Sequence, residues 1–174
     1  MHLICKNNHI YFFLFKDVCL PGWNVNPSNC RCYKFIQESV TWTEANKRCQ
    51  EIAPTNQPPN PPVTRRHLAA IENVEENNFV ANLVGGKKAW LGGFKFADGT
   101  WGWTDGLKWE GGYTNWRRGQ GRPDEPNNFG GRENSLLINW SGYGLWNDSP
   151  YQNKYSFVCQ YLDLTKLSLC KNQK

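Results

Sequence analysis

The sequence has few of the features that mark membrane spans, disorder or nucleic-acid binding. No apolar run reaches the ~18 residues of a membrane span, and the apolar stretch at 10–15 is shorter than the ~7–15 residues of a signal-peptide core. Charged residues are only 20% of the 174, which argues against disorder over most of the chain. The net charge of +5 comes from scattered basic pairs such as Arg117-Arg118, without a basic stripe, so nucleic acid is a poor candidate partner.

Cysteine, in contrast, is abundant. Seven Cys in one chain of this size predict an oxidising compartment, and the odd number leaves at least one thiol free or paired with another chain. No small-residue cleavage site follows the stretch at 10–15, so either the true signal is missing from this sequence or export is unusual. The length fits one domain, and an aromatic content of 14% can supply its core.

Two segments are predicted to be helices. Thr41 is a good N-cap, and Glu44 three residues later completes a capping box for a helix over 41–50. Cys49 falls on the apolar face of this helix and is expected to point at the core. Asn73, with Glu76 at the corresponding box position, predicts that a second helix begins at residue 73.

The remaining regular elements are predicted to be short strands. They are expected at 67–71, 89–93, 101–104, 136–139, 145–146 and 157–160. Five prolines between 51 and 66 predict an inserted surface loop there. From 107 to 134 the chain is rich in Gly, Asn, Arg and Pro, which predicts a second long loop, and the segment at 162–174 is predicted to be a tail.

Five oxygen-bearing side chains lie in one stretch near the C-terminal end of this second loop: Glu125, Asn127, Glu133, Asn147 and Asp148. The stretch contains no His or Cys, which a zinc site would need. Carboxylate and amide oxygens suit Ca²⁺, which takes about 6–8 oxygen ligands. If the five groups converge, the ion is calcium. The alternative is a polar surface loop, which composition alone favours, because such residues are common in loops.

The order of these residues resembles the sugar-binding loop of the C-type lectins. The shared marks are Glu-Pro-Asn at 125–127, an acidic residue six positions after Asn127, Trp-Asn-Asp at 146–148 and a closing Cys159. Further marks upstream extend the resemblance over roughly 19–161. It implies an α+β C-type lectin-like fold, with two helices flanking small antiparallel sheets and a long calcium- and sugar-binding loop. It also implies an N-terminal segment at 1–18, which is a leader remnant or an extra strand, a lectin domain at 19–161 and a tail at 162–174.

The resemblance implies two disulfides. They are Cys49–Cys159 and Cys19–Cys32, although Cys30 makes the second pairing ambiguous. The pairing of Cys5, Cys30 and Cys170 is left open. The positions of another family disulfide hold Ser135 and Tyr151, so that bridge is absent. The sequence also has a glycosylation sequon at 139–141.

The function implied by the resemblance is calcium-dependent binding of glycans by a secreted protein, in recognition or defence. All five oxygen-bearing residues would bind both Ca²⁺ and sugar, Asp148 also through its backbone carbonyl. Pro126 would follow a cis peptide bond, and Phe129 would either touch the sugar or anchor the loop. Glu before the proline and Asn after it is the family's order for mannose, glucose, N-acetylglucosamine or fucose, whereas Gln-Pro-Asp prefers galactose.

Two other functions compete with this one. A C-type-lectin-like module can bind proteins, ice or mineral without sugar, and the inserted loops favour that alternative. A glycosidase using Glu125 and Glu133 would need one carboxyl with a raised pKa, whereas carboxylates that hold calcium stay ionised. No His-Glu-x-x-His motif is present, so no catalytic residue is assigned. The expected partner is a glycan, and a disulfide-linked or non-covalent homo-oligomer is allowed.

Overall fold

The computed structural model describes residues 4–6, 9–11, 18–52, 66–106, 109, 111–119, 121 and 123–171. Residues 4–6, 9–11 and 171 are described by their backbone alone. Most of the predicted proline-rich loop, residues 53–65, lies outside these ranges.

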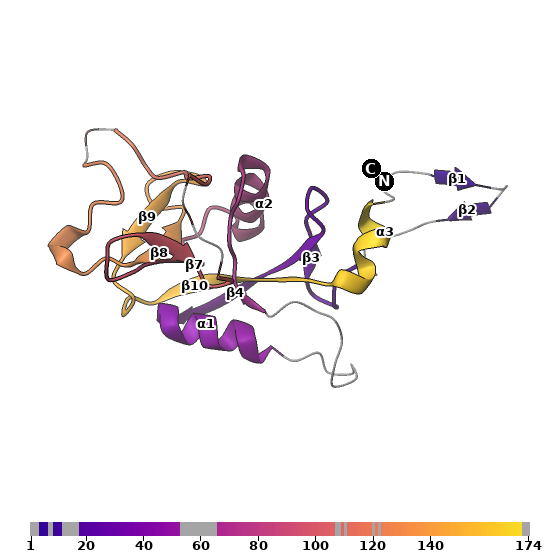
Figure 1. Ribbon diagram of the computed structural model, residues 1–174, viewed down its shortest axis with the longest axis horizontal. Coiled ribbons are helices and arrows are strands. Elements are labelled where there is room, and N and C mark those ends of the chain that lie inside the picture. Colours follow the sequence, from indigo (N-terminus) through magenta and orange to yellow (C-terminus); the bar gives the residue numbers. More distant parts are fainter. Residues whose placement is uncertain are drawn as a thin grey trace.

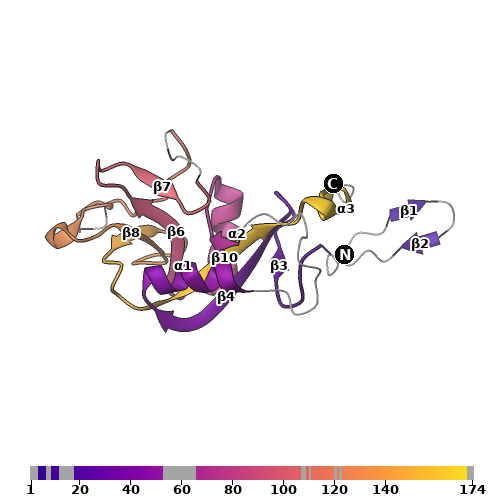
Figure 2. The same cartoon turned by 60° about the horizontal axis from the view of Figure 1, so that its bottom comes forward.

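One eight-stranded mixed sheet forms the centre of the protein (Figure 1). Its strands are β3 (Asn24–Val25), β4 (Arg31–Val40), β5 (His67–Leu68), β6 (Ala89–Lys95), β7 (Trp101–Trp103), β8 (Ser135–Ile138), β9 (Trp146–Ser149) and β10 (Tyr155–Leu162). The order is β3-β4-β10-β6-β8-β9, with β5 pairing with β10 and β7 with β6. The pairing of β10 with β6 is parallel. Strands β1 (Ile4–Lys6) and β2 (His9–Tyr11) form a separate sheet, apart from the first in Figure 2.

Two helices lie on opposite sides of β4 and β10, α1 (Trp42–Glu51) and α2 (Val74–Val84) (Figure 1). Both predicted N-caps are confirmed: Thr41 Oγ1 accepts from the Glu44 N–H at 3.3 Å, and Asn73 Oδ1 accepts from the Glu76 N–H at 2.8 Å. Cys49 is fully buried, as its helical face predicted. No helix in the described part of the chain is long and apolar enough to cross a membrane.

Strand β9 is longer than predicted, and this changes where two candidate ligands lie. It continues through Ser149 because it pairs with β8, with Leu136 opposite Asp148 and Leu137 opposite Asn147. Asn147 and Asp148 are therefore held in a sheet, although both residue types have low strand propensity. Strand β5 is shorter than predicted because Ala69 bonds Val158 through its N–H and Gly92 through its carbonyl, so the chain crosses from β10 to β6 there.

Three disulfides lie within the described part of the chain, and two of them join segments more than 100 residues apart. Cys19 bonds Cys32 and Cys49 bonds Cys159, which are the two pairings that the resemblance implied. The third pairing, left open by the sequence, is Cys30–Cys170. Cys170 lies in α3 (Leu167–Lys171), which follows a 3-10 turn at Leu164–Lys166, so the part of the predicted tail at 164–171 is helical and is joined to the turn before β4 by this disulfide.

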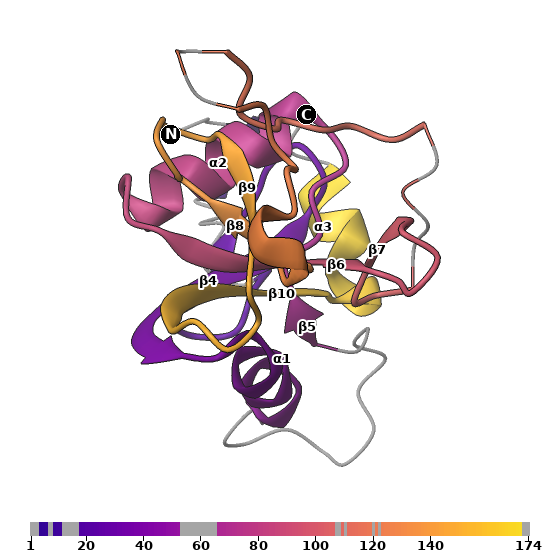
Figure 3. The ribbon, with the colours of Figure 1, turned by 90° about the vertical axis from the view of Figure 1, so that its left-hand side faces the viewer.

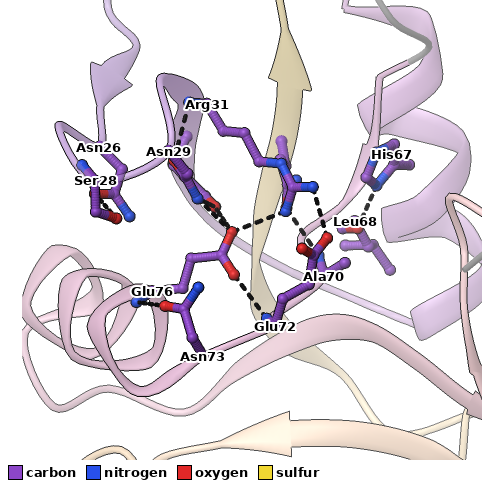
Figure 4. A network of polar contacts seen from close by, with 12 residues as sticks. Asn26, Ser28, Asn29, Arg31, His67, Leu68, Ala70, Glu72, Asn73 and Glu76 are labelled. Atoms are coloured by element: carbon purple, nitrogen blue, oxygen red, sulfur yellow. Dashed lines mark hydrogen bonds and ion pairs between the residues drawn. The ribbon is translucent and has the colours of Figure 1, made fainter. Parts of the chain in front are cut away.

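A buried carboxylate joins α2 to β4 (Figure 4). Glu76 has no exposed surface, and its Oε1 accepts from Asn29 Nδ2 at 2.5 Å, Arg31 Nη1 at 2.9 Å and the Tyr33 hydroxyl at 2.6 Å. Its Oε2 accepts from the Glu72 N–H at 2.6 Å. The capping box predicted for this helix is therefore incomplete, because the Glu76 side chain bonds these four groups and not the N–H of the cap residue Asn73.

We predict that Glu76→Ala lowers the free energy of unfolding by about 3 kcal/mol, because it leaves the buried Tyr33 hydroxyl without its acceptor and removes one of the two carboxylates paired with Arg31. Chemical denaturation of the oxidised protein measures this. The matched control is Glu75→Ala in the same helical turn, where the side chain is exposed and the expected change is within about 0.5 kcal/mol. Equal losses in the two variants would contradict the role assigned to Glu76.

Candidate functional site

A cluster of tryptophans underlies the long loop. Trp103 stacks on Trp109 with ring centroids 4.5 Å apart, and Trp109 stacks on Trp116 at 5.7 Å. The buried ring of Trp146 meets all three edge-on, at 6.0, 5.5 and 5.8 Å. Aromatic rings bury large areas and prefer such stacked and edge-to-face geometries. The cluster thus fixes two chain positions that lead into the candidate site, since Trp116 precedes Arg117 and Trp146 precedes Asn147.

Backbone hydrogen bonds place these two positions side by side. The Trp146 N–H donates to the Asn115 carbonyl at 2.9 Å, and the Arg117 N–H donates to the Trp146 carbonyl at 3.0 Å. The indole N–H of Trp146 reaches Asn77 Oδ1 on α2 at 2.7 Å. The Glu125 N–H then donates to the Arg117 carbonyl at 2.9 Å, so the Glu-Pro-Asn triplet begins next to β9.

Glu125 is the most deeply buried residue of that triplet, with 3% of its surface exposed. The peptide bond to Pro126 is cis, which is the form that the resemblance implied. Glu125 Oε1 accepts from Arg117 Nη2 at 2.8 Å. Its Oε2 is buried and accepts no hydrogen bond from any part of the chain that the structure describes. A buried carboxylate oxygen without a donor is costly, and a bound cation would satisfy it.

The carboxylates of Asp148 and Glu133 both accept hydrogen bonds from the backbone of the loop that carries the triplet. The fully buried Asp148 carboxylate accepts from the Asn127 N–H at 3.1 Å and from the Asn128 N–H at 2.9 Å. Glu133 Oε2 accepts from the Phe129 N–H at 2.7 Å, and the Glu133 N–H donates to Asn128 Oδ1 at 3.0 Å. Figure 3 faces this end of the molecule, with the orange turn at Phe129–Gly131 in front.

The three carboxylates of the candidate site are close enough to repel one another. Burial raises the pKa of Glu133 to about 6, with the charges of Asp148 and Glu125 adding to the rise against the opposing N–H of Phe129. Burial also raises the pKa of Asp148, and the charge of Glu125 contributes. Like charges gathered in a partly desolvated place favour either protonation or a bound cation.

Asn147 is the fifth candidate ligand, with 4% of its surface exposed. Its Nδ2 donates to the carbonyl of Asp148, so the carbonyl that the resemblance assigns to calcium is engaged within the chain. Among the described residues, no three His, Cys, Asp or Glu side chains are grouped so as to hold a metal by themselves. A metal here therefore needs the amide oxygens of Asn127 and Asn147 as well, a ligand set that fits Ca²⁺.

The structure corrects three interpretations of single residues. Phe129 is 81% exposed, so its ring does not anchor the loop. Asn139, the acceptor residue of the glycosylation sequon, is buried and its Nδ2 donates to the Lys87 carbonyl, so the folded protein does not present this amide at its surface. Arg117, counted among scattered basic residues, is 2% exposed and bonded to Glu125. Nothing in the charge pattern separates it from the exposed Arg118 beside it.

A separate groove of about 540 Å³ lies between β3 and α2. Its lining includes Trp23, Phe79 and Leu83 and shares no residue with the candidate site. The candidate site is therefore separate from this groove.

Comparison with known proteins was made by sequence and by structure. The family model described as the lectin C-type domain matches residues 38–161. A lectin from Pleurodeles waltl is 33% identical over 149 residues, which cover 82% of this chain and 76% of that protein. C-type lectin domain family 10 member A from Homo sapiens is 32% identical over 146 residues, which are 83% of this chain but 41% of the human protein. The chain thus spans less than half of that relative's length.

The fold agrees with these sequence matches. The crystal structure of the C-type lectin CEL-I from Cucumaria echinata superposes with a TM-score of 0.67 at 25% identity, covering 83% of this chain and 98% of that one. The predicted α+β C-type lectin-like fold is thereby confirmed, with most of its strands in a single eight-stranded mixed sheet and not in small antiparallel ones. Since the family model covers most of the chain, the protein belongs to the C-type lectin family.

Proposed function

We propose that the protein binds mannose-type glycans through a calcium ion held by Glu125, Asn127, Glu133, Asn147 and Asp148. The observation that carries the proposal is the buried Oε2 of Glu125, which accepts no hydrogen bond from the described residues. The carboxylates of Glu133 and Asp148 lie nearby and add to the negative charge of the site. Family membership supports carbohydrate recognition, and it makes calcium dependence plausible.

Each residue of the site has a distinct task in this proposal. A bound calcium would supply positive charge and coordination positions for two neighbouring sugar hydroxyls. Glu125 and Asn127 offer an acceptor before the proline and an amide donor after it, which is the order of the mannose-type lectins. Asp148 and Glu133 hold the backbone of the loop with their carboxylates. The exposed Phe129 ring offers an apolar surface beside them.

The glycosidase alternative does not survive the comparisons. A pKa of about 6 at Glu133 is suited to a general acid. The C-type lectin family is, however, one of binding proteins and not of enzymes, so no catalytic role is assigned.

The setting of the domain is part of the same proposal. Three disulfides are typical of a protein exposed to an oxidising compartment, which supports a secreted lectin domain at 19–161. Sugar binding at a single site is expected to be weak, so we propose that oligomers supply avidity.

We predict that the protein is retained on mannose–agarose in millimolar Ca²⁺ and released by EDTA, because extracellular calcium modules bind at about 10⁻⁴–10⁻³ M. Galactose–agarose is the matched column and should retain less protein. Retention that ignores EDTA would overturn the proposal. A failure to bind any sugar on a glycan array would instead favour a lectin-like module that binds protein, ice or mineral.

We predict that Glu125→Gln combined with Asn127→Asp shifts binding toward galactose, because the exchange reverses acceptor and donor. The measurement is the ratio of mannose to galactose inhibition constants on an immobilised glycan. Calcium titration of the variant is the control that its metal site persists. An unchanged ratio in a variant that still binds calcium would show that the surrounding loops select the sugar.

We predict that apparent calcium affinity falls as the pH drops from 7.5 to 5. Because the pKa of Glu133 is raised to about 6, this group is protonated at pH 5 in the metal-free protein, and Ca²⁺ must displace its proton. Calcium titrations at the two pH values test this. The same affinity at both would contradict the assignment of Glu133 as a ligand.

A further inference from the structure

Arg117 is a buried cation at the base of the loop that precedes the Glu-Pro-Asn triplet. Its side chain is 2% exposed, and it forms an ion pair with Glu125, whose side chain is 4% exposed. Its Nη1 donates to the Gly119 carbonyl at 3.0 Å, and its Nη2 donates to both the Pro123 carbonyl and Glu125 Oε1. The guanidinium therefore contacts Gly119 and Pro123 near the two ends of this loop and Glu125 directly after it.

The backbone of Arg117 closes the same loop. Its N–H donates to the Trp146 carbonyl at 3.0 Å and its carbonyl accepts from the Glu125 N–H at 2.9 Å. Arg117 is thus tied to β9 on one side and to the first residue of the triplet on the other. Gly119 and Pro123, which lie between Arg117 and the triplet, are both bonded to this one arginine.

A second, exposed ion pair crosses the loop and serves for comparison. Arg118 Nη1 lies 3.6 Å from Asp124 Oδ2, with side chains 61% and 54% exposed. Exposed pairs of this kind contribute little, whereas removing one partner of a buried pair leaves an uncompensated charge. The neighbouring arginines therefore provide a functional candidate and its control in adjacent positions.

The two oxygens of Glu125 are in unlike surroundings. Oε1 is held by Arg117, while Oε2 is buried and has no donor in the described part of the chain. The guanidinium is itself held by the Gly119 and Pro123 carbonyls, so its place is set by the loop and not by Glu125 alone. A fixed donor on one oxygen leaves the other as the oxygen available to a metal.

We propose that Arg117 is the positioning residue for Glu125, holding Oε1 so that Oε2 is presented to calcium. The inference rests on the proposed function, in which Glu125 is a calcium ligand. Groups that orient metal ligands in this way typically affect metal affinity by about 10–100-fold.

Charge repulsion alone would predict the opposite change in calcium affinity on removal of Arg117. A guanidinium close to a calcium site repels the ion, so its removal would strengthen binding if Arg117 did nothing else. Orientation by Arg117 instead predicts that its removal weakens binding. The direction of the change in calcium affinity thus separates a positioning group from a bystander charge.

The test compares Arg117→Gln, Arg117→Lys and Arg118→Gln by isothermal titration with Ca²⁺ and by proteinase K digestion in EDTA. We expect Arg117→Gln to bind calcium about tenfold more weakly and to be cut sooner within 117–125. Arg117→Lys should recover part of the affinity, since a lysine supplies charge and one bond but not the planar fork. Arg118→Gln should stay within about twofold of the parent protein, as expected for an exposed pair.

The outcomes distinguish this inference from the function on which it rests. Calcium binding in Arg117→Gln or Arg117→Lys that equals or exceeds that of the parent overturns the positioning role and leaves the proposed function intact. No calcium binding by the parent protein refutes the proposed function and, with it, this role. If Arg117→Gln does not fold, the folded Arg117→Lys variant decides by the same criterion. A lower melting temperature with unchanged calcium affinity would show a role in stability alone.

Discussion

The packing of Trp146 against the other tryptophans is the constraint on which the candidate site depends. Its buried ring meets three tryptophan rings edge-on, while its backbone bonds Asn115 and Arg117 on the neighbouring segment. The residues directly after it are Asn147 and Asp148, so the aromatic contact and the sheet pairing of β9 place two candidate ligands without any metal.

The candidate site brings three negatively charged carboxylates together. Glu125, Glu133 and Asp148 lie near one another, and the protein offsets part of their repulsion with backbone N–H groups and with Arg117. Glu76 is also a buried carboxylate, but it accepts hydrogen bonds from four donors and so contributes to the stability of the fold. The contrast between a satisfied carboxylate and one with an unpartnered oxygen is what separates a structural group from a candidate ligand.

Much of the fold was predictable because its signals are local. The N-caps at Thr41 and Asn73 depend on residues three positions apart, and both are confirmed. Strand ends were less predictable, because β9 extends through Asn147 and Asp148 only where β8 lies beside it. The resemblance carried the candidate site, since composition alone favoured a polar surface loop. The burial of Arg117 and of Glu76 was not predicted, because the burial of a charged group depends on partners that lie beyond the local sequence pattern.

The sequence by itself was enough to predict the class of ion, because a stretch with carboxylates and amides but no His or Cys suits a hard cation. It also determined both helix starts through short-range capping. Only the tertiary structure decided that Cys30 bonds Cys170, that Asn139 is buried and that Arg117 holds Glu125. Each of these depends on which surfaces the folded core brings into contact, and contact between distant segments is not written in local residue spacing.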